Sequence, residues 1–179
     1  MEFWIIRAQY SENRVKFLFL EFPQPGILHC MQFTLTHIGP RSTAGDEFNG
    51  LSTLYLERTS AFVPCDSASF RSQQDFLEWL GRKQGRVPLV PVLLDRRGRQ
   101  MASEAFAAWI GARRDQGTRH IAFAIGPADG WSDDARGKAQ LLLSLGPMTF
   151  PHSLARLVLA EQLYRACTIL AGHPYHTGH

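Results

Sequence analysis

Cysteine is scarce in this sequence, and the three cysteines lie far apart. Cys30, Cys65 and Cys167 form no CxxC pair, and their number is odd. Small proteins held together by disulfides carry even numbers of cysteines at short, regular spacings. The pattern therefore argues against a disulfide framework and predicts a reducing, cytoplasmic environment.

Long hydrophobic runs are also missing. No apolar stretch approaches the roughly 18 residues that a membrane-spanning helix needs, so we expect no membrane partner. The first 30 residues hold only a short apolar run, 17–22, and charged residues interrupt the apolar ones before it. A signal peptide needs an unbroken apolar core, which this segment lacks.

Lysine is rare beside arginine, although the overall charge is only mildly basic. The formal net charge is +3 and the isoelectric point is about 9.0. Arginine offers a planar, bidentate fork to phosphate groups and stacks on bases. Arg96, Arg97 and Arg99 cluster in one predicted loop, and Arg113 and Arg114 lie near a predicted helix end. This pattern fits an RNA-facing surface and, equally well, a solvated arginine-rich one.

What the sequence does contain is a regular alternation of predicted strands and helices. Its 179 residues, of which 45% are hydrophobic and 20% charged, suit one globular domain with its own core. Hydrophobic patterns and turn residues predict strands at 32–38, 61–65, 87–94, 120–125 and 141–145, and helices at 46–58, 70–84, 103–116, from 132 and from 151. This alternation predicts an α/β fold: a single-domain, mostly parallel sheet flanked by helices on both faces.

Two prolines bear on the position of the third predicted strand. Pro88 and Pro91 each remove a backbone donor from the segment 87–94. Proline is confined mostly to edge strands for that reason, so the pattern predicts an edge position.

Helix ends are marked by residues with known preferences. Ser103 is predicted to cap the helix that follows it, and Pro151 suits the first turn of the last helix. Gly172 is predicted to end that helix in the left-handed conformation. Glu161 and Arg165 are four residues apart in the favourable order, so we expect a weak ion pair between them on the surface.

The first 30 residues differ from the rest of the chain. Pro23 and Pro25 break this segment, and a new strand pattern begins directly after Met31. We therefore divide the chain into an N-terminal extension, 1–30, read as the product of an upstream start site, and a domain, 31–179. The alternative is that the extension is a genuine element that packs on the domain.

The C-terminal third of the chain contains two long motifs. They read SLGPMTFPHSLARLVLAEQLYRA, from position 144, and GHPYH, from position 172. Two further motifs stand upstream, LLDRRGRQMASEAFA from position 93 and FAIGPADG from position 123. Together they closely resemble the motifs of the RlmH family, bacterial 23S rRNA (pseudouridine-N3) methyltransferases of the SPOUT class, over about 31–176.

The resemblance implies a fold, a reaction and partners. Members of this family are homodimers that use S-adenosylmethionine to methylate N3 of a pseudouridine in the 23S rRNA of assembled ribosomes. Their sheet contains the strand at 87–94 in its interior and carries a C-terminal trefoil knot, which strand patterns do not predict because knots are rare. We therefore expect S-adenosylmethionine as cofactor, 23S rRNA within the ribosome as substrate and a second copy of the chain as partner.

Carried over residue by residue, the resemblance places the cofactor in three loops that follow predicted strands. These loops contain Leu94, Gly126 and the run Leu145, Gly146, Pro147, Met148, Thr149 and Phe150. Ligands of α/β sheets bind beyond the carboxyl ends of the strands, and glycine lets the backbone approach them closely. The alternative is that the glycines serve only the turns. Pro127 stands where the family has a second glycine, and it removes a backbone donor.

The resemblance also places substrate-handling residues near both ends of the last helix. Tyr175 is expected to stack on a base, and His176, which titrates near neutral pH, to help remove the N3 proton. Arg156, in the first turns of the helix, is expected to hold a phosphate or to orient the base. The alternatives are an idle terminal histidine and a solvated helix arginine.

Two other functions stay open. Thr177 stands where the family has a basic residue, so the alternative to an enzyme is a catalytically weak or inactive ribosome-binding protein of the same fold. The second is a zinc site, although the spacing of its ligands fits no standard finger, and we expect no metal. Its candidate ligands are Cys167, His173, His176 and His179.

Overall fold

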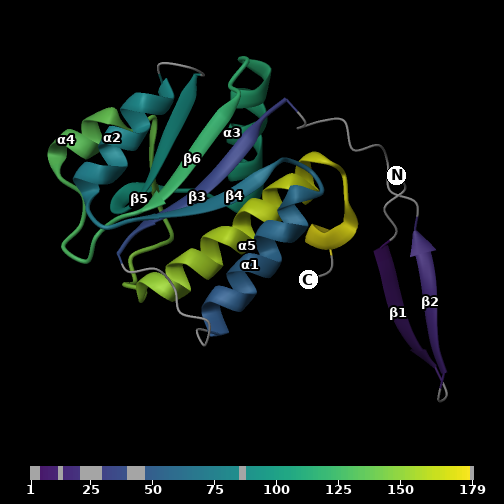
Figure 1. The fold of residues 1–179 in the computed structure, drawn as a ribbon. Helices are drawn as coiled ribbons and strands as arrows, with labels where there is room; N and C mark the ends of the chain where they lie inside the picture. The colour runs from purple at the N-terminus through teal and green to yellow at the C-terminus, as the bar shows by residue number, and fades with distance from the viewer. Residues whose placement is uncertain (1–4, 12–13, 21–29, 40–46, 85–87, 178–179) are drawn as a thin grey trace.

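The computed structural model describes residues 5–11, 14–20, 30–39, 47–84 and 88–177 (Figure 1). Its strands are β1 Ile5–Ser11, β2 Arg14–Leu20, β3 Gln32–Ile38, β4 Cys65–Phe70, β5 Leu89–Gln100, β6 His120–Ile125 and β7 Leu141–Ser144. Its helices are α1 Glu47–Ser60, α2 Gln73–Gln84, α3 Ser103–Asp115, α4 Asp133–Lys138, α5 His152–Leu170 and the 3₁₀ helix η1 Pro174–Thr177. The predicted breaks at Pro23 and Pro25, the zinc candidate His179 and the side chain of His176 lie outside the described parts.

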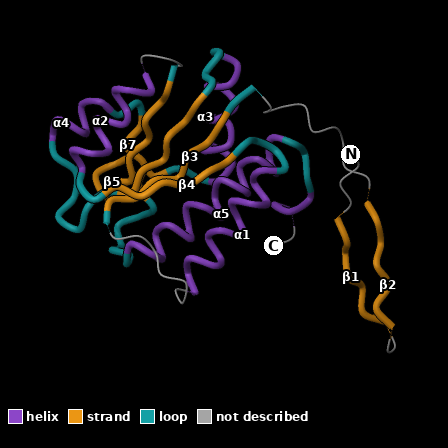
Figure 2. The backbone as a smooth tube through the Cα atoms, viewed as in Figure 1, coloured by secondary structure: helices purple, strands orange, loops and turns teal. Residues whose placement is uncertain are grey.

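Five strands form one sheet in the order β4-β3-β6-β5-β7, and every pair in it is parallel. Helices α1, α3 and α5 cover one face of this sheet, and α2 and α4 cover the other (Figure 1). Figure 2 shows the strands as a layer between the two groups of helices. The predicted α/β fold with a helix-flanked parallel sheet is confirmed.

The central strand β6 explains how the two faces differ. All of its residues are buried, as its continuous apolar run predicts for a strand covered on both sides. Ile121, Phe123 and Ile125 pack with α1, α3 and α5, whereas Ala122 and Ala124 face α2 and α4. The small alanines leave room on the second face for an aromatic cluster. This cluster consists of Phe70, Phe76, Trp79 and Trp131.

Strand β5 lies inside the sheet, between β6 and β7, so the edge position predicted from its prolines is wrong. Pro88 precedes the strand, which begins at Leu89. The carbonyl of Pro91 accepts a hydrogen bond from Gln140 at 2.9 Å, on the side of β7. The N–H and C=O of one residue point to the same side of a strand, and β7 begins only at Leu141. A backbone N–H at position 91 would therefore point to the side of β7 but before β7 begins. The N–H that Pro91 lacks thus has no partner in β7 to lose.

The second sheet strand is shifted from its predicted place. The sequence predicts a strand at 61–65, but residues 61–64 connect α1 to β4, which runs from Cys65 to Phe70. Strand β4 is polar because it pairs only with β3 at the edge of the sheet. Val63, in the connection, is fully buried in the core. The apolar residues at 61–64 therefore reflect burial in the core and not a strand.

The structure confirms some of the predicted helix ends and contradicts others. Ser103 does not cap α3; its hydroxyl donates to the Gln162 side chain of α5 at 2.7 Å. Pro151 is the N-cap residue of α5, one position before the predicted first turn. Gly172 ends α5 with φ of +67°, as predicted. Among the described helices, none is long and apolar enough to cross a membrane.

Strands β1 and β2 form a separate antiparallel hairpin, which pairs with no strand of the main sheet. The division of the chain into an extension, 1–30, and a domain, 31–179, stays a prediction. The C-terminal trefoil knot also stays a prediction.

Candidate functional site

The carboxyl ends of β6, β5 and β7 lie next to one another because these strands are neighbours in a parallel sheet. Leu94 of β5 pairs with Ile125 on one side and with Leu143 on the other. Three segments follow just beyond these residues. Strand β5 continues to Gln100, so the free loop predicted after Leu94 is wrong, but 95–98 loops out of the pairing with β7 before Arg99 rejoins it. The segments 126–131 and 145–150 leave the sheet. The sequence-predicted residues Leu94 and Gly126 and the segment 145–150 therefore meet at one edge, where α/β sheets bind ligands.

The loop 145–150 is open and partly apolar. Gly146 has φ of +124°, a backbone conformation that favours glycine, and an added Cβ atom would meet nothing within 4 Å. The hydroxyl of Ser144 bonds both the N–H and the C=O of Gly146, each at 3.2 Å. Leu145 and Phe150 are half-buried, and Met148 is 74% exposed. The loop thus combines free space with apolar side chains that another molecule would cover.

The loop 126–131 contains a tight turn that accommodates Pro127. The N–H of Gly130 donates to the carbonyl of Pro127 at 2.9 Å, and Gly130 has φ of +86°. Pro127 is the first residue of this turn, a position whose own N–H the turn does not use. The proline that departs from the family pattern therefore leaves the turn intact.

Trp131 joins this loop to the end of β5. Its side chain is 3% exposed, and its indole N–H donates to the carbonyl of Leu94 at 2.9 Å. A Cβ atom on Gly126 would lie 2.8 Å from the indole ring. Position 126 therefore needs glycine to leave space for the Trp131 ring, whether or not a ligand also binds beside it.

Asp95 follows Leu94 directly and is buried in an ion pair. Its carboxylate accepts from Arg136 Nε of α4 at 2.6 Å and from the backbone N–H of Arg97 at 2.8 Å. Burial of Asp95 opposes ionisation, but the Arg97 N–H and the Arg136 guanidinium outweigh it and lower the pKa of the carboxyl group. The Arg97 side chain also lies 3.7 Å from Asp133, so part of the predicted arginine cluster serves internal ion pairs. Arg96 and Arg99 are exposed.

Arg156 lies in the second turn of α5, a few residues after the loop 145–150. Only 8% of it is exposed, so the solvated-arginine alternative is wrong for this residue. Arg165, further along α5, pairs with Glu161 at 2.7 Å, which confirms the predicted ion pair, but the two side chains are only 17% and 18% exposed, so its predicted place on the surface is wrong.

The C-terminal tail is held against the second half of α5. The Tyr175 hydroxyl donates to Glu161 Oε1 at 3.2 Å, and the guanidinium of Arg165 lies 5.0 Å from the centre of the Tyr175 ring. The Tyr164 ring meets Tyr175 edge to face at 4.8 Å. Burial, a hydrogen bond with Tyr55 and the Glu161 charge together raise the pKa of the Tyr175 phenol. The phenol is therefore a neutral group packed into the fold.

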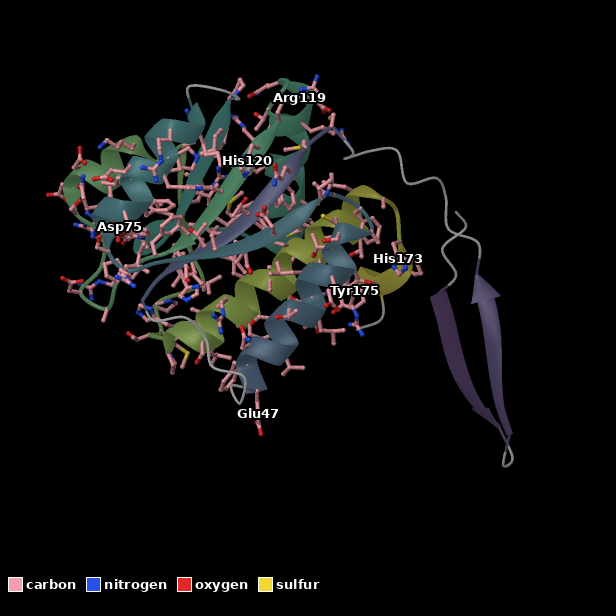
Figure 3. The ribbon with its side chains drawn as sticks, in the orientation of Figure 1. Glu47, Asp75, Arg119, His120, His173 and Tyr175 are labelled. Carbon is pink, nitrogen blue, oxygen red and sulfur yellow. The ribbon has the colours of Figure 1, made fainter. Side chains whose placement is uncertain are left out.

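Within one chain, the tail and the loop 145–150 are far apart. Helix α5 has 19 residues, which span about 28 Å at about 1.5 Å per residue. Glu161, which holds the Tyr175 hydroxyl, lies about 14 Å along the axis from His152 by the same rise. Figure 3 shows His173 and Tyr175 in the tail that folds back along the helices. The structure thus gathers the three loops with the start of α5, and places the tail against the second half of that helix.

Sequence reasoning missed Trp131, Asp95 and Arg136. A signal was present: an acidic residue directly after a buried strand, and an aromatic residue at the end of a glycine-containing loop. Neither signal says which residue on another element is the partner.

The zinc alternative gains no support from Cys167. This residue is fully buried in the hydrophobic core between α5 and the sheet. Burial raises the pKa of its thiol, whereas a zinc ligand must be a thiolate.

Comparison with known proteins adds relatives over most of the chain. Residues 31–176 match the sequence profile of the family described as "Predicted SPOUT methyltransferase". The "Ribosomal RNA large subunit methyltransferase H" of Koribacter versatilis is 49% identical over 125 residues, which cover 70% of this chain and 85% of that protein. The protein of the same name from Xanthobacter autotrophicus is 42% identical over 160 residues, 82% of this chain and 99% of that protein.

Similar solved structures are more distant. The SpoU methyltransferase AviRb from Streptomyces viridochromogenes, in complex with AdoMet, is 12% identical, with a TM-score of 0.42. The match covers 82% of this chain and 66% of that one. At this TM-score the likeness adds nothing to the assignment of a function.

Proposed function

Because the chain belongs to the SPOUT methyltransferase family, we propose that it transfers a methyl group from S-adenosylmethionine to N3 of a pseudouridine in 23S rRNA. The observation that carries the proposal is the 42% identity to a large-subunit rRNA methyltransferase over 99% of that protein's length. The substrate would be the rRNA within the large ribosomal subunit, so the reaction would take place in the cytoplasm.

The three loops at the sheet edge fit a bound S-adenosylmethionine. The cofactor residues would be Leu94, Gly126, Leu145, Gly146, Pro147, Met148, Thr149 and Phe150. The space beside Gly146 admits a ligand close to the backbone. Since Ser144 bonds the N–H and the C=O of Gly146, the backbone groups of the other loop residues would bind the adenine. Exposed Met148 and half-buried Leu145 and Phe150 would cover apolar parts of the ligand and exclude water. When bound, S-adenosylmethionine supplies an electrophilic methyl group on a sulfonium ion.

The protein's own residues would position the base and take its proton. N3 of pseudouridine must lose its proton before its electron pair can form the new N–C bond. His176 would accept this proton and pass it to solvent, since a histidine titrates near neutral pH. Arg156, buried near the loop 145–150, would hold a phosphate or orient the base. Tyr175 would complete the substrate end of the tail.

A homodimer would bring these groups together. Within one chain, the tail lies against the second half of α5, away from the loop 145–150, so the tail of one copy would serve the loops of the other. Exposed apolar side chains at every third position of α1 favour such an association. These are Phe48, Leu51 and Leu54, between 39% and 47% exposed.

A direct experiment separates this enzyme from the alternative, an inactive ribosome-binding protein of the same fold. Ribosomes from a strain that lacks the modification are incubated with the protein and S-adenosylmethionine labelled in the methyl group, and the methylated nucleotide is mapped. The proposal predicts label at N3 of a single pseudouridine of 23S rRNA. Binding to ribosomes without transfer of label would favour the alternative instead.

A further inference from the structure

Trp131 occupies the space between two of the three loops at the sheet edge. It is the last residue of the loop 126–131, and its ring lies against the backbone of Gly126, where a Cβ atom would approach within 2.8 Å. From there its N–H reaches the carbonyl of Leu94 on the neighbouring strand, at 2.9 Å. One side chain thus contacts two of the positions at which we place the cofactor.

Helix α4, which follows Trp131, is attached to the same region from two sides. Arg136 Nε donates to Asp95 at 2.6 Å, one residue beyond Leu94. At the start of the helix, the hydroxyl of Ser132 accepts from the Gln73 side chain of α2 at 2.7 Å, and its N–H donates back to Gln73 at 2.9 Å. These contacts fix the helix, and with it the position of the indole ring.

We propose that Trp131, supported by Arg136, is a positioning residue that sets the separation of Leu94 and the loop 126–131 for S-adenosylmethionine. The inference rests on the proposed function, since it concerns the cofactor of that reaction. Trp131 contacts loop backbone and not the reacting atoms, so it would act through Leu94 and Gly126.

The contacts give a physical reason for this role. The pairing of β5 with β6 ends at Leu94 and Ile125, and beyond that point no ladder bond holds the two segments together. The indole hydrogen bond and the Arg136–Asp95 ion pair replace the ladder there. Binding sites lose affinity when such supporting contacts are removed, because the binding groups shift by fractions of an ångström.

The aromatic cluster offers a matched pair of variants. Trp131 and Trp79 both pack on Phe76, with ring centres 5.4 Å and 6.1 Å away. Trp131 contacts the loops, whereas Trp79 lies near His120, at the amino end of β6 and away from the loops. Trp131→Phe removes the indole donor to Leu94, and Trp79→Phe removes similar ring volume from the same cluster.

The test measures S-adenosylmethionine affinity by calorimetry and urea unfolding midpoints for the full-length wild type and both variants. We expect Trp131→Phe to weaken affinity about tenfold, because cofactor binding must then order Leu94 and the loop 126–131 without this bond, at a cost similar to the worth of one hydrogen bond. Trp79→Phe should leave the affinity unchanged. In ribosome methylation, Trp131→Phe should raise KM for S-adenosylmethionine while KM for ribosomes stays constant. Wild-type affinity in Trp131→Phe, or equal losses in both variants, would overturn the proposal.

A second pair of variants covers the case in which Trp131→Phe does not fold. Arg136→Gln removes the ion pair with Asp95, and Lys138→Gln removes an exposed pair with Asp134 on the same helix. We expect weaker S-adenosylmethionine binding only for Arg136→Gln, and equal affinities for the two would contradict the inference. A wild-type protein that binds no S-adenosylmethionine would overturn both this inference and the proposed function, whereas a failure confined to the variants concerns only the inference.

Discussion

A Cβ atom on Gly98 would lie 2.6 Å from both the carbonyl carbon and the carbonyl oxygen of Leu142, so the backbones of β5 and β7 touch at this point. Leu143 pairs first with Leu94 and then with Arg99, which means that the intervening residues of β5 leave the ladder and return to it. Only glycine permits two backbones to approach this closely.

We therefore predict that Gly98→Ala destabilises the fold. The methyl group has no space without a backbone shift, and overpacking of this kind costs about 1–3 kcal/mol. Urea unfolding followed by circular dichroism measures the effect. Gly81→Ala is the control, because Gly81 lies in α2 with nothing within 4 Å and should gain up to about 1 kcal/mol in helix propensity. Equal stabilities of the two variants would contradict the close approach.

His120 should make stability depend on pH near neutrality. Its ring is buried and bonds Thr34 Oγ1 at 2.8 Å (Figure 3 shows its place in the sheet). Burial lowers the pKa of His120 below 6.5; the Asp66 charge opposes this shift and Lys83 adds to it. Because the folded pKa lies below the unfolded one, the unfolded chain binds the proton more readily. Stability is then complete above about pH 6.5 and falls with decreasing pH, by at most about 1.4 kcal/mol per pH unit.

His120→Gln tests this prediction. Glutamine offers Thr34 a hydrogen-bonding group but does not titrate, so the variant should lose less stability than the wild type between pH 7 and pH 5, measured by urea midpoints. Parallel curves for the two proteins would show that other groups cause the pH dependence.

A chain that begins at Met31 should fold and bind S-adenosylmethionine as the full chain does. The β1–β2 hairpin is a separate sheet, and the family match begins at residue 31. Circular dichroism, calorimetry with S-adenosylmethionine and sedimentation velocity measure fold, affinity and oligomeric state. Loss of solubility or of self-association in the shortened chain would show that the extension is part of the folded protein.

The sequence predicts most elements of the main sheet because their signals are local. The apolar run of β6 and the strand at 32–38 have the predicted bounds. The position of β5 was not predictable from propensity, because the effect of Pro91 depends on which neighbour its missing N–H would face. The second strand is predicted too early in the sequence for a related reason: β4 is an edge strand, and an edge strand needs no apolar pattern on its open side.

In the candidate site, too, some residues were predicted from the sequence and some contacts were not. Motifs located Leu94, Gly126 and the loop at 145–150, and the strand order then explains why these distant segments meet. The contact between Trp131 and Leu94 and the packing of Tyr175 on Glu161 join elements far apart in the sequence. Such contacts follow from tertiary packing, which no local pattern encodes.

Two defective variants should restore activity when mixed. Gly146→Val forces a β-branched residue into a positive-φ position and should disable the cofactor loop. His176→Ala should disable the tail. If each site combines the loop of one copy with the tail of the other, half of a randomly mixed population is heterodimer with one intact site, giving about a quarter of wild-type activity. Methyl transfer to ribosomes after co-refolding measures this, and no gain above the separate variants would place loop and tail in the same chain.

His176→Ala should separate a proton-handling role from a role in binding. The residue lies beyond Gly172, in the 3₁₀ helix η1, so its backbone is not part of α5. We expect fold, self-association and S-adenosylmethionine affinity to stay near wild-type values, while single-turnover methyl transfer to ribosomes falls about 10²–10⁴-fold, the usual contribution of general acid–base catalysis. The rate should be measured across pH, because loss of a base removes the pH dependence that its titration causes.

The size of the fall in rate and its dependence on pH decide between two roles of His176. A fall of only a few-fold, with an unchanged pH profile, would indicate that His176 positions the base and that solvent removes the N3 proton. Tyr175→Phe is the matched variant: it removes the hydroxyl that donates to Glu161 and keeps the ring beneath Arg165. If the tail must be anchored for His176 to act, Tyr175→Phe should lower the rate while leaving the pH profile intact. A His176→Ala enzyme that matches the wild type at every pH would make the histidine a bystander and Arg156 the better candidate for the reacting site.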